Sequence, residues 1–280
     1  MQIFKTRKEL TAFVKKNKKD NEIGFVPTMG ALHDGHLSLV RCSLKNTDIT
    51  IVSIFVNPTQ FNNTEDLKKY PRDIEKDIST LKNTGVDIIF TPSEKEIYPK
   101  KDNRIFDFDG IDKIMEGKYR NGHFNGVAQV VSILFDIVQP DKVFFGQKDF
   151  QQISIIKKMV EKLNYNVKII SCPIIREKDG LAMSSRNTLL QEQYRKEAIL
   201  INRVLQESIN IFNKYKDIKR VKEWTVNEIN KSALLKLEYF DIVDELTLQN
   251  TNNTNNNKLV GCIAVWAGNV RLIDNIIFNS

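Results

Sequence analysis

Strand-like runs alternate with helix-like segments through the first 175 residues or so of this chain. The strand-like runs, each next to a Pro, Gly or Asn, cover 23–26, 49–56, 86–91, 142–145 and 167–170. Helical periodicity covers 73–84, 127–138 and 150–163. Strands separated by helices are typical of βαβ units. The pattern therefore predicts an α/β fold with a Rossmann-like doubly wound parallel sheet, in which ligands bind beyond the carboxyl ends of the strands.

The pattern changes after about Asn187. Helices are predicted over 189–212 and 221–235, followed by strand-like runs over 237–243, 259–266 and 270–277. Gly268-Asn269 between the last two runs predicts a tight hairpin. We therefore expect a Rossmann-like domain over residues 1–175 and a smaller α+β domain over 176–280. The stretch 250–257 is nearly all Asn and Thr and is expected to be a surface loop.

Composition and charge exclude several classes of protein. No apolar run approaches the roughly 20 residues of a membrane helix, and residues 1–8 lack a signal-peptide run. We therefore expect a cytoplasmic protein with no membrane partner. The three cysteines are scattered and form no CxxC pair, which predicts buried thiols rather than disulfides or a thiolate zinc site. The net charge of +7 suits either a polynucleotide or a polyanionic small molecule, and the diffuse lysines favour the latter.

The segment PTMGALHDGH, residues 27–36, carries the strongest chemical signal. A strand ends, a glycine-containing loop follows and a helix begins, with Asp34 as the expected cap. This arrangement presents backbone N–H groups and the positive end of a helix to an anion, and Gly30 and Gly35 permit close approach. His33 and His36 converge at the helix start and suit charge on a phosphorus transition state. A zinc site is not expected, because only one further histidine exists and no cysteine is near.

Three other segments carry polar groups beside predicted strands or loops. In FFGQKDFQQ, residues 144–152, Lys148 can reach a phosphate, while Asp149 could cap the next helix or bind a ribose. The loop GLAMSSR, residues 180–186, is either a phosphate clamp or a polar linker. Gln60 follows a buried strand and offers both a donor and an acceptor. His123 alone is expected to pack within its loop rather than to catalyse.

Taken together and in order, six segments closely resemble the pantoate–β-alanine ligase family: PTMGALHDGH, SIFVNPTQF, YPR, GHFNGV, VFFGQKDFQQ and DGLAMSSRN. The resemblance runs from about Gly24 to Asn187, and RLIDN at 271–275 also fits the closing strand of the family. The helical part of the C-terminal domain is similar only in general character. Two positions depart from the family pattern, where Gln147 replaces the usual Glu and Asn121 replaces a common Pro.

The resemblance implies an enzyme of coenzyme A precursor biosynthesis. Members of the family condense D-pantoate with β-alanine to pantothenate in two steps. The pantoate carboxylate first attacks the α-phosphorus of ATP, and β-alanine then attacks the pantoyl-adenylate, so that pyrophosphate and AMP are released. Mg²⁺ assists by bridging phosphate oxygens. The resemblance also implies a homodimer, with the C-terminal domain as a lid.

Site residues carried over from the family fall into two groups. ATP is assigned to Met29, Gly30, Ala31, Leu32, His33, Asp34, Gly35, His36, Gly146, Gln147, Lys148, Asp149, Ile175, Met183, Ser184, Ser185 and Arg186. Pantoate is assigned to Gln60 and Gln152, and Gln60 also serves β-alanine. His33, His36, Lys148, Ser184, Ser185 and Arg186 are implied to act in catalysis, with His36 as the proton donor of the family. No protein metal ligand is implied.

Two alternative functions remain open on the residues alone. Another nucleotidylyltransferase of the same HxGH superfamily would share the ATP site but lack the paired Gln60 and Gln152. A basic nucleic-acid-binding protein with an inactive nucleotide fold would bind polynucleotides with a steep salt dependence. The ordered set of motifs favours the ligase over both.

Overall fold

The computed structural model describes residues 1–62, 64–250 and 258–278, and the chain divides into two compact units. The first unit comprises Met1–Asp112, Gly117–Gln147 and Gln152–Pro173. The second unit comprises Lys113–Glu116, Lys148–Gln151 and Ile174–Ser280. Two short segments that lie early in the chain therefore belong with the C-terminal part, and one of them contains Lys148.

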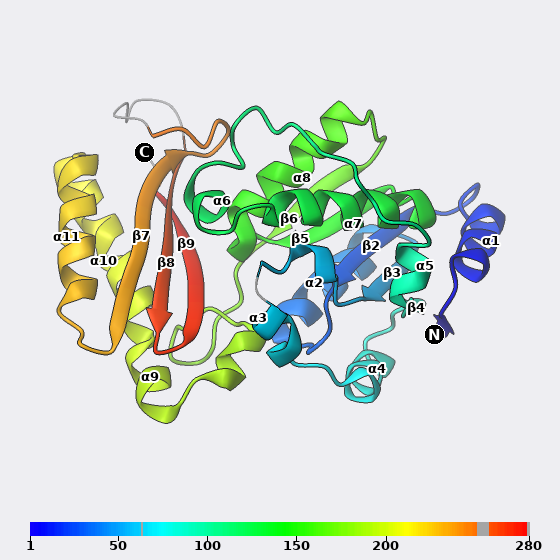
Figure 1. Ribbon diagram of the computed structural model, residues 1–280, viewed down its shortest axis with the longest axis horizontal. Coiled ribbons are helices and arrows are strands. Elements are labelled where there is room, and N and C mark those ends of the chain that lie inside the picture. Colours follow the sequence, from blue (N-terminus) through cyan, green and yellow to red (C-terminus); the bar gives the residue numbers. More distant parts are fainter. Residues whose placement is uncertain (63, 251–257, 279–280) are drawn as a thin grey trace. The chain divides into compact units, whose positions relative to one another are not determined.

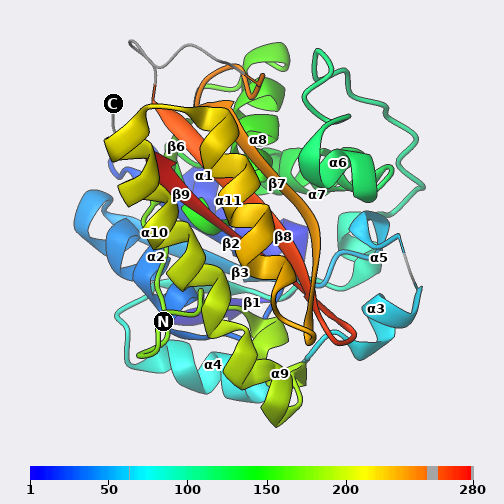
Figure 2. The ribbon, with the colours of Figure 1, turned by 90° about the vertical axis from the view of Figure 1, so that its left-hand side faces the viewer.

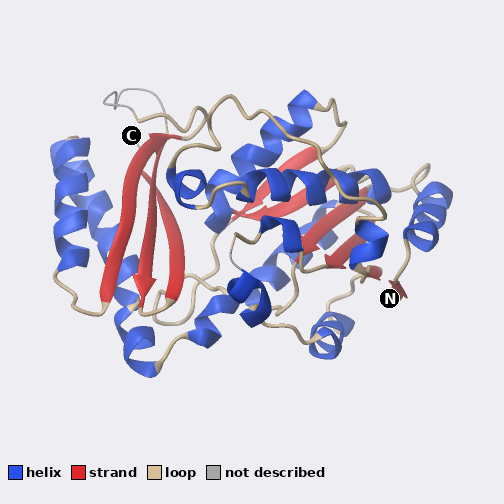
Figure 3. Ribbon diagram, in the orientation of Figure 1, coloured by secondary structure: helices blue, strands red, loops and turns tan. Residues whose placement is uncertain are grey.

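A six-stranded parallel sheet forms the centre of the first unit (Figures 1 and 3). In spatial order its strands are β1 (Gln2–Phe4), β4 (Ile88–Phe90), β3 (Ile49–Ile54), β2 (Ile23–Thr28), β5 (Lys142–Gly146) and β6 (Lys168–Cys172). Every neighbouring pair is parallel. The connections after β2 and after β5 lead to opposite sides of the sheet, which places the topological switch point between these two strands. The predicted α/β class with a doubly wound parallel sheet is confirmed.

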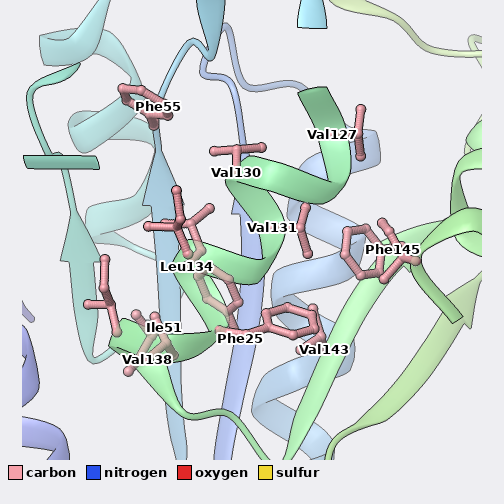
Figure 4. Packing of buried hydrophobic residues seen from close by; sticks show 14 of the residues in the cluster. Phe25, Ile51, Phe55, Val127, Val130, Val131, Leu134, Val138, Val143 and Phe145 are labelled. Atoms are coloured by element: carbon pink, nitrogen blue, oxygen red, sulfur yellow. The ribbon is translucent and has the colours of Figure 1, made fainter. Parts of the chain in front are cut away.

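Helices bury both faces of this sheet. They are α1 (Arg7–Asn17), α2 (Asp34–Asn46), α4 (Ile74–Lys82), α5 (Glu94–Ile97), α7 (His123–Val138) and α8 (Phe150–Lys162). Helix α3 (Thr64–Lys69) also belongs to the first unit, and the residues of α6 (Met115–Tyr119) and of α8 are divided between the two units. Successive residues of a strand point to opposite faces. Phe25 of β2 accordingly packs with α1, α7 and α8 in one cluster, and Val26 packs with α2 and α4 in another. Figure 4 shows Phe25 beside Leu134 of α7.

The second unit has an antiparallel sheet of β7 (Leu235–Asp244), β8 (Leu259–Ala267) and β9 (Val270–Phe278). Helices α10 (Ile199–Tyr215) and α11 (Ile218–Asn230) lie along this sheet (Figure 2), and α9 (Glu192–Glu197) precedes them. Their apolar faces share one buried cluster with the strands. The predicted hairpin is confirmed, because Ala267 pairs with Val270 and Gly268 adopts a φ of +58°.

Several element boundaries differ from the predicted ones. Strand β2 continues through Pro27 to Thr28, because the pairing of β2 with β5 ends at Phe25 and a missing N–H on that side costs no hydrogen bond. The long helix expected over 189–212 is three elements, η3 (Ser185–Leu189), α9 and α10. The expected surface loop at 250–257 lies, beyond residue 250, outside the described residues. In the described part of the chain, no helix is long and apolar enough to span a membrane.

Candidate active site

The two paired histidines build the start of α2. His33, with extended backbone at a φ of −141°, is the N-cap, and its Nδ1 accepts a hydrogen bond from Gly35 N at 3.1 Å. His36 Nδ1 accepts in turn from His33 N at 3.3 Å, which completes a reciprocal capping box. The prediction that Asp34 caps this helix is therefore wrong. Asp34 is instead the first helical residue, and His33 before it is the N-cap.

These bonds determine the tautomer of each ring. A ring nitrogen that accepts an N–H bond carries its lone pair, so the neutral imidazole holds its proton on the other nitrogen. Both His33 and His36 are thereby assigned as Nε2–H tautomers. Their ring centroids lie 4.1 Å apart with an interplanar angle of 39°. The structure thus brings the two histidines together, as predicted, with two neighbouring Nε2–H groups.

A buried carboxylate holds the loop before these histidines. Asp77 of α4 accepts from Ala31 N at 2.9 Å and from Leu32 N at 2.8 Å. Burial raises the pKa of Asp77, and the two N–H bonds oppose that rise. Gly30 has a φ of +81°, and a Cβ there would lie 2.7 Å from Asp77 Oδ2. Asp77 and the backbone conformation therefore both require glycine at position 30.

The loop N–H groups have different partners from those we expected. Gly30 N bonds to Thr28 Oγ1 at 3.3 Å, and the N–H groups of residues 31, 32, 33 and 35 bond to Asp77 or to the histidine rings. An anion at this loop would therefore be met first by the imidazoles. Sequence reasoning missed Asp77, although its spacing of four from buried Leu81 places this acid on the buried face of α4.

Gln60 lies in a buried polar cluster at the end of the neighbouring strand β3. It ends the short helix η1 (Pro58–Gln60), and its Oε1 accepts from Asn57 Nδ2 at 3.1 Å. Its Nε2 lies 3.1 Å from Met29 Sδ. Asn57 Oδ1 is itself held by the hydroxyl of Tyr98 at 2.8 Å, and burial raises the pKa of Tyr98 to about 12. These contacts orient the Gln60 amide so that its donor faces the histidine loop.

His123 supports the same glutamine from α7. The ring is buried, and its Nδ1 lies 2.8 Å from the main-chain oxygen of Gln60. A carbonyl only accepts, so Nδ1 of His123 carries the proton, unlike the other two histidines. Gly126 permits the close approach of η1, since a Cβ there would lie 2.4 Å from Thr59 O. This contact agrees with the packing role predicted for His123.

The turn around Lys148 belongs to the second unit. Lys148 Nζ lies 3.3 Å from Asp149 Oδ1, and the carboxylate of Asp149 is half exposed. The main-chain oxygen of Lys148 accepts from Asn275 Nδ2 of β9 at 3.0 Å. Gly146 is the last residue of β5 and Gln147 follows it, and both belong to the first unit. Gln152, in the first turn of α8, belongs to the first unit as well.

The serine-rich loop follows a small hairpin in the second unit. Met183 N bonds to Ile175 O at 3.0 Å, and Arg176 forms a β-bridge with Ala182. Ser184 then caps η3, where its Oγ accepts from Arg186 N at 3.2 Å. The structure therefore brings five of the predicted residues together at one end of this hairpin: Ile175, Met183, Ser184, Ser185 and Arg186.

Side chains that could bind a metal ion are the last feature of the site, and the structure shows how they are distributed. Across residues 1–62, 64–250 and 258–278, no group of three or more His, Cys, Asp or Glu side chains could hold a metal ion. Magnesium usually binds through substrate phosphates with one or two carboxylates rather than through an all-protein cage.

Comparisons with known proteins give matches over nearly the whole chain. A family model described as Pantoate-beta-alanine ligase matches residues 2–277. The pantothenate synthetase of Christiangramia forsetii is 49% identical over 100% of both chains, and that of Porphyromonas gingivalis is 48% identical over 99% of both.

Solved structures are similar over the whole chain as well. A pantothenate synthetase from Thermus thermophilus has a TM-score of 0.92 and 35% identity and covers 99% of each chain. A pantoate-beta-alanine ligase from Francisella tularensis, complexed with beta-gamma ATP and beta-alanine, has a TM-score of 0.84 and 37% identity. That match covers 100% of this chain and 98% of the other.

Proposed function

This chain belongs to the pantoate–β-alanine ligase family, and on that premise we propose which of its residues perform each step of the reaction. It is an ATP-binding ligase of pantothenate biosynthesis that joins pantoate to β-alanine. We propose that it works in the cytoplasm as a homodimer, through a pantoyl-adenylate that β-alanine converts to pantothenate. The observation that carries the residue roles is the reciprocal capping of His33 and His36.

Activation by ATP answers the chemical difficulty of the reaction. A carboxylate repels an attacking amine and has no good leaving group. In the proposed first step a pantoate carboxylate oxygen attacks the α-phosphorus of ATP, the bond to the β-phosphate oxygen breaks, and pyrophosphate leaves. In the second step the β-alanine amine attacks the acyl carbon, AMP leaves with the bonding electrons, and the nitrogen loses a proton to solvent. Protein groups contribute mainly by positioning and by stabilising charge.

His33 and His36 bind the phosphates in this proposal. Their Nδ1 atoms are engaged in the cap, so each ring offers its Nε2–H to a phosphate oxygen. His36 is assigned as the proton donor. Met29, Gly30, Ala31, Leu32, Asp34 and Gly35 complete the ATP-binding segment. Because Asp77 holds this segment, the rings are oriented before ATP arrives, which lowers the cost of ordering them.

Lys148 and the serine-rich loop both belong to the second unit. Lys148 stabilises negative charge on the α-phosphoryl group as it develops, and Asp149 with Gly146 and Gln147 holds the ribose and phosphate. Ser184, Ser185 and Arg186, with Met183 and Ile175 beside them, close on the phosphates. Support comes from the small hairpin that supplies this loop and from the ion pair between Lys148 and Asp149. We also propose that residues 176–280 act as a lid.

Gln60 and Gln152 bind pantoate, and Gln60 also serves β-alanine. The Gln60 amide is already oriented by Asn57 and by the His123 contact to its backbone, which supports a recognition role. We further propose that ATP enters as its Mg²⁺ complex. The ion would neutralise charge on the phosphate oxygens, and those oxygens with water would supply most of its ligands.

One assay tests the whole proposal. Purified protein is incubated with ATP, Mg²⁺ and labelled pyrophosphate, with and without pantoate, and the label entering ATP is measured. We expect exchange only with pantoate, and pantothenate and AMP in equal amounts once β-alanine is added. A different nucleotidylyltransferase would show no exchange with pantoate, and that result would overturn the proposal. Polynucleotide binding that weakens steeply with salt would instead favour the nucleic-acid alternative.

A further inference from the structure

Two consecutive residues of β9 contact two segments to which the proposed function assigns ATP. Asp274 and Asn275 lie in the second unit, on the red strand of Figure 1, and are 4% and 2% exposed. Neither residue is among those assigned to a substrate. Their side chains nevertheless form hydrogen bonds with the turn around Lys148 and with the hairpin of residues 175–183.

Asn275 holds the main chain of the Lys148 turn. Its Nδ2 donates to Lys148 O at 3.0 Å, so it fixes the backbone from which the lysine side chain extends. A second contact set holds the other end of this turn, because Gln151 Oε1 accepts from Glu116 N at 2.9 Å, and Glu116 pairs with Arg271 of β9 at 2.7 Å. Both ends of the segment 148–151 are therefore held by residues that connect it to β9.

Asp274 holds the stem of the hairpin. Its carboxylate accepts from both terminal nitrogens of Arg176, at 2.6 and 3.1 Å, in a bidentate pair. Arg176 Nη1 also donates to Gly180 O at 3.1 Å, so the same guanidinium closes the hairpin turn. Asp274 Oδ1 in addition accepts from Asn275 N at 2.8 Å, which couples the two side chains to each other.

We propose that Asp274 and Asn275 are positioning residues that set the Lys148 turn and the serine-rich loop in register for adenylyl transfer. The proposal rests on the proposed role of Lys148. Neighbouring positions of one strand are held at a constant separation by the backbone, so two loops anchored to them share a fixed reference. A lysine whose backbone shifts by about 1 Å loses much of its benefit in the transition state, where a misplacement of that size can cost about 100-fold.

A double-mutant cycle separates positioning from simple stabilisation. The variants are Asn275→Ala, Lys148→Ala and both together, and pantoate-dependent pyrophosphate exchange gives kcat and KM for ATP. Ser208→Ala is the matched control, because Ser208 is equally buried in the second unit and donates within its own helix, to Leu205 O. Thermal unfolding of each variant, read by tryptophan fluorescence, measures the loss of stability.

We expect Asn275→Ala to lower kcat about tenfold in the wild-type background and to have almost no effect when Lys148 is already Ala. Ser208→Ala should lose comparable stability and keep its kcat. Equal effects of Asn275→Ala in both backgrounds would overturn the proposal, as would an unchanged kcat. If Lys148→Ala itself has normal kcat, the assigned role of Lys148 fails instead, and that failure is visible without the Asn275 variant.

A second experiment, with Asp274→Asn, tests the role of the hairpin independently. Loss of the charge pair with Arg176 should loosen the 184–186 loop and raise KM for ATP at least about fivefold, with a smaller change in kcat. Combined with Arg186→Ala, the change in KM should be less than the product of the single effects. Multiplicative effects would show that Asp274 does not act through the loop and would overturn this part of the proposal.

Discussion

The His36 imidazole accepts an N–H bond in the cap of α2 and is also the proposed proton donor, and a single substitution can separate these two roles. His36→Gln should keep the cap, because a Gln at the third helical position also reaches back to the N-cap N–H. We expect pantoate-dependent pyrophosphate exchange to fall below detection while the thermal midpoint changes little. His36→Ala should lose the same activity and, in addition, about 1 kcal/mol of stability.

The Gln variant therefore decides the interpretation. Exchange near the wild-type rate in His36→Gln would show that the imidazole is not needed for adenylate formation. A large fall in its thermal midpoint would instead show that the cap requires the imidazole ring.

Lys148 lies within reach of Asp149 before any substrate binds, so its ammonium group is already paired in the free protein. If its bond to the α-phosphoryl group forms mainly in the transition state, Lys148→Ala should lower kcat for pyrophosphate exchange far more than it raises KM for ATP. We expect a loss of at least about 100-fold in kcat, measured by initial rates over a range of ATP concentrations. A rise in KM alone would contradict a transition-state role.

At the scale of elements, periodicity and turn residues predicted most of the framework. The strand-like runs at 49–56 and 142–145 became β3 and β5, and Asp73 caps α4 next to the predicted start at that residue. Local patterns did not reveal β1, a three-residue edge strand that exists through its pairing with β4. Short strands of this kind depend on tertiary contacts more than on propensity.

The site was predictable to a similar degree and for a similar reason. The HxxH pair could be read from its spacing along one helix start. Asp77 and Asn275 could not, because their partners lie 45 and 127 residues away and only the fold brings them together. Even Asn57, close to Gln60 in sequence, depends for its orientation on Tyr98, at the end of α5.

One link between elements gives a prediction about pH. Asp109 pairs with Lys158 at 2.8 Å and with Lys162 at 2.7 Å, both on α8, and these lysines lower the pKa of Asp109 to about 2. The unfolded chain therefore binds more protons between about pH 4 and pH 2, and the stabilisation is lost as the pH falls through that window. Asp109→Asn should be less stable than the wild type at pH 7, by urea unfolding followed with far-UV circular dichroism.

The difference between Asp109→Asn and the wild type should shrink as the pH falls towards 2. High salt should also reduce it at pH 7, because the carboxylate is half exposed and the pair is screened. A difference that grows below pH 4 would mean that Asp109 is not stabilised in its charged form.

At the scale of the whole molecule, each unit contains a buried apolar core of its own. Both tryptophans of the chain, Trp224 and Trp266, lie in the second unit, so their fluorescence reports on that unit. Each core also contains a buried phenylalanine in an edge-on ring contact. Phe212 lies 5.2 Å from Phe278 in the second unit, and Phe135 lies 5.6 Å from Tyr165 in the first.

These two phenylalanines allow a matched test of how the units unfold. Phe212→Ala should lower the stability of the second unit by about 3–5 kcal/mol, because truncating a buried aromatic ring removes its contacts and leaves a cavity. In urea, its fluorescence transition should move to lower concentration together with the loss of ligase activity, since that unit holds Lys148 and the serine-rich loop. Phe135→Ala should move the circular dichroism transition and leave most of the fluorescence midpoint in place. If Phe135→Ala shifts both transitions equally, the two units unfold as one cooperative body despite their separate cores.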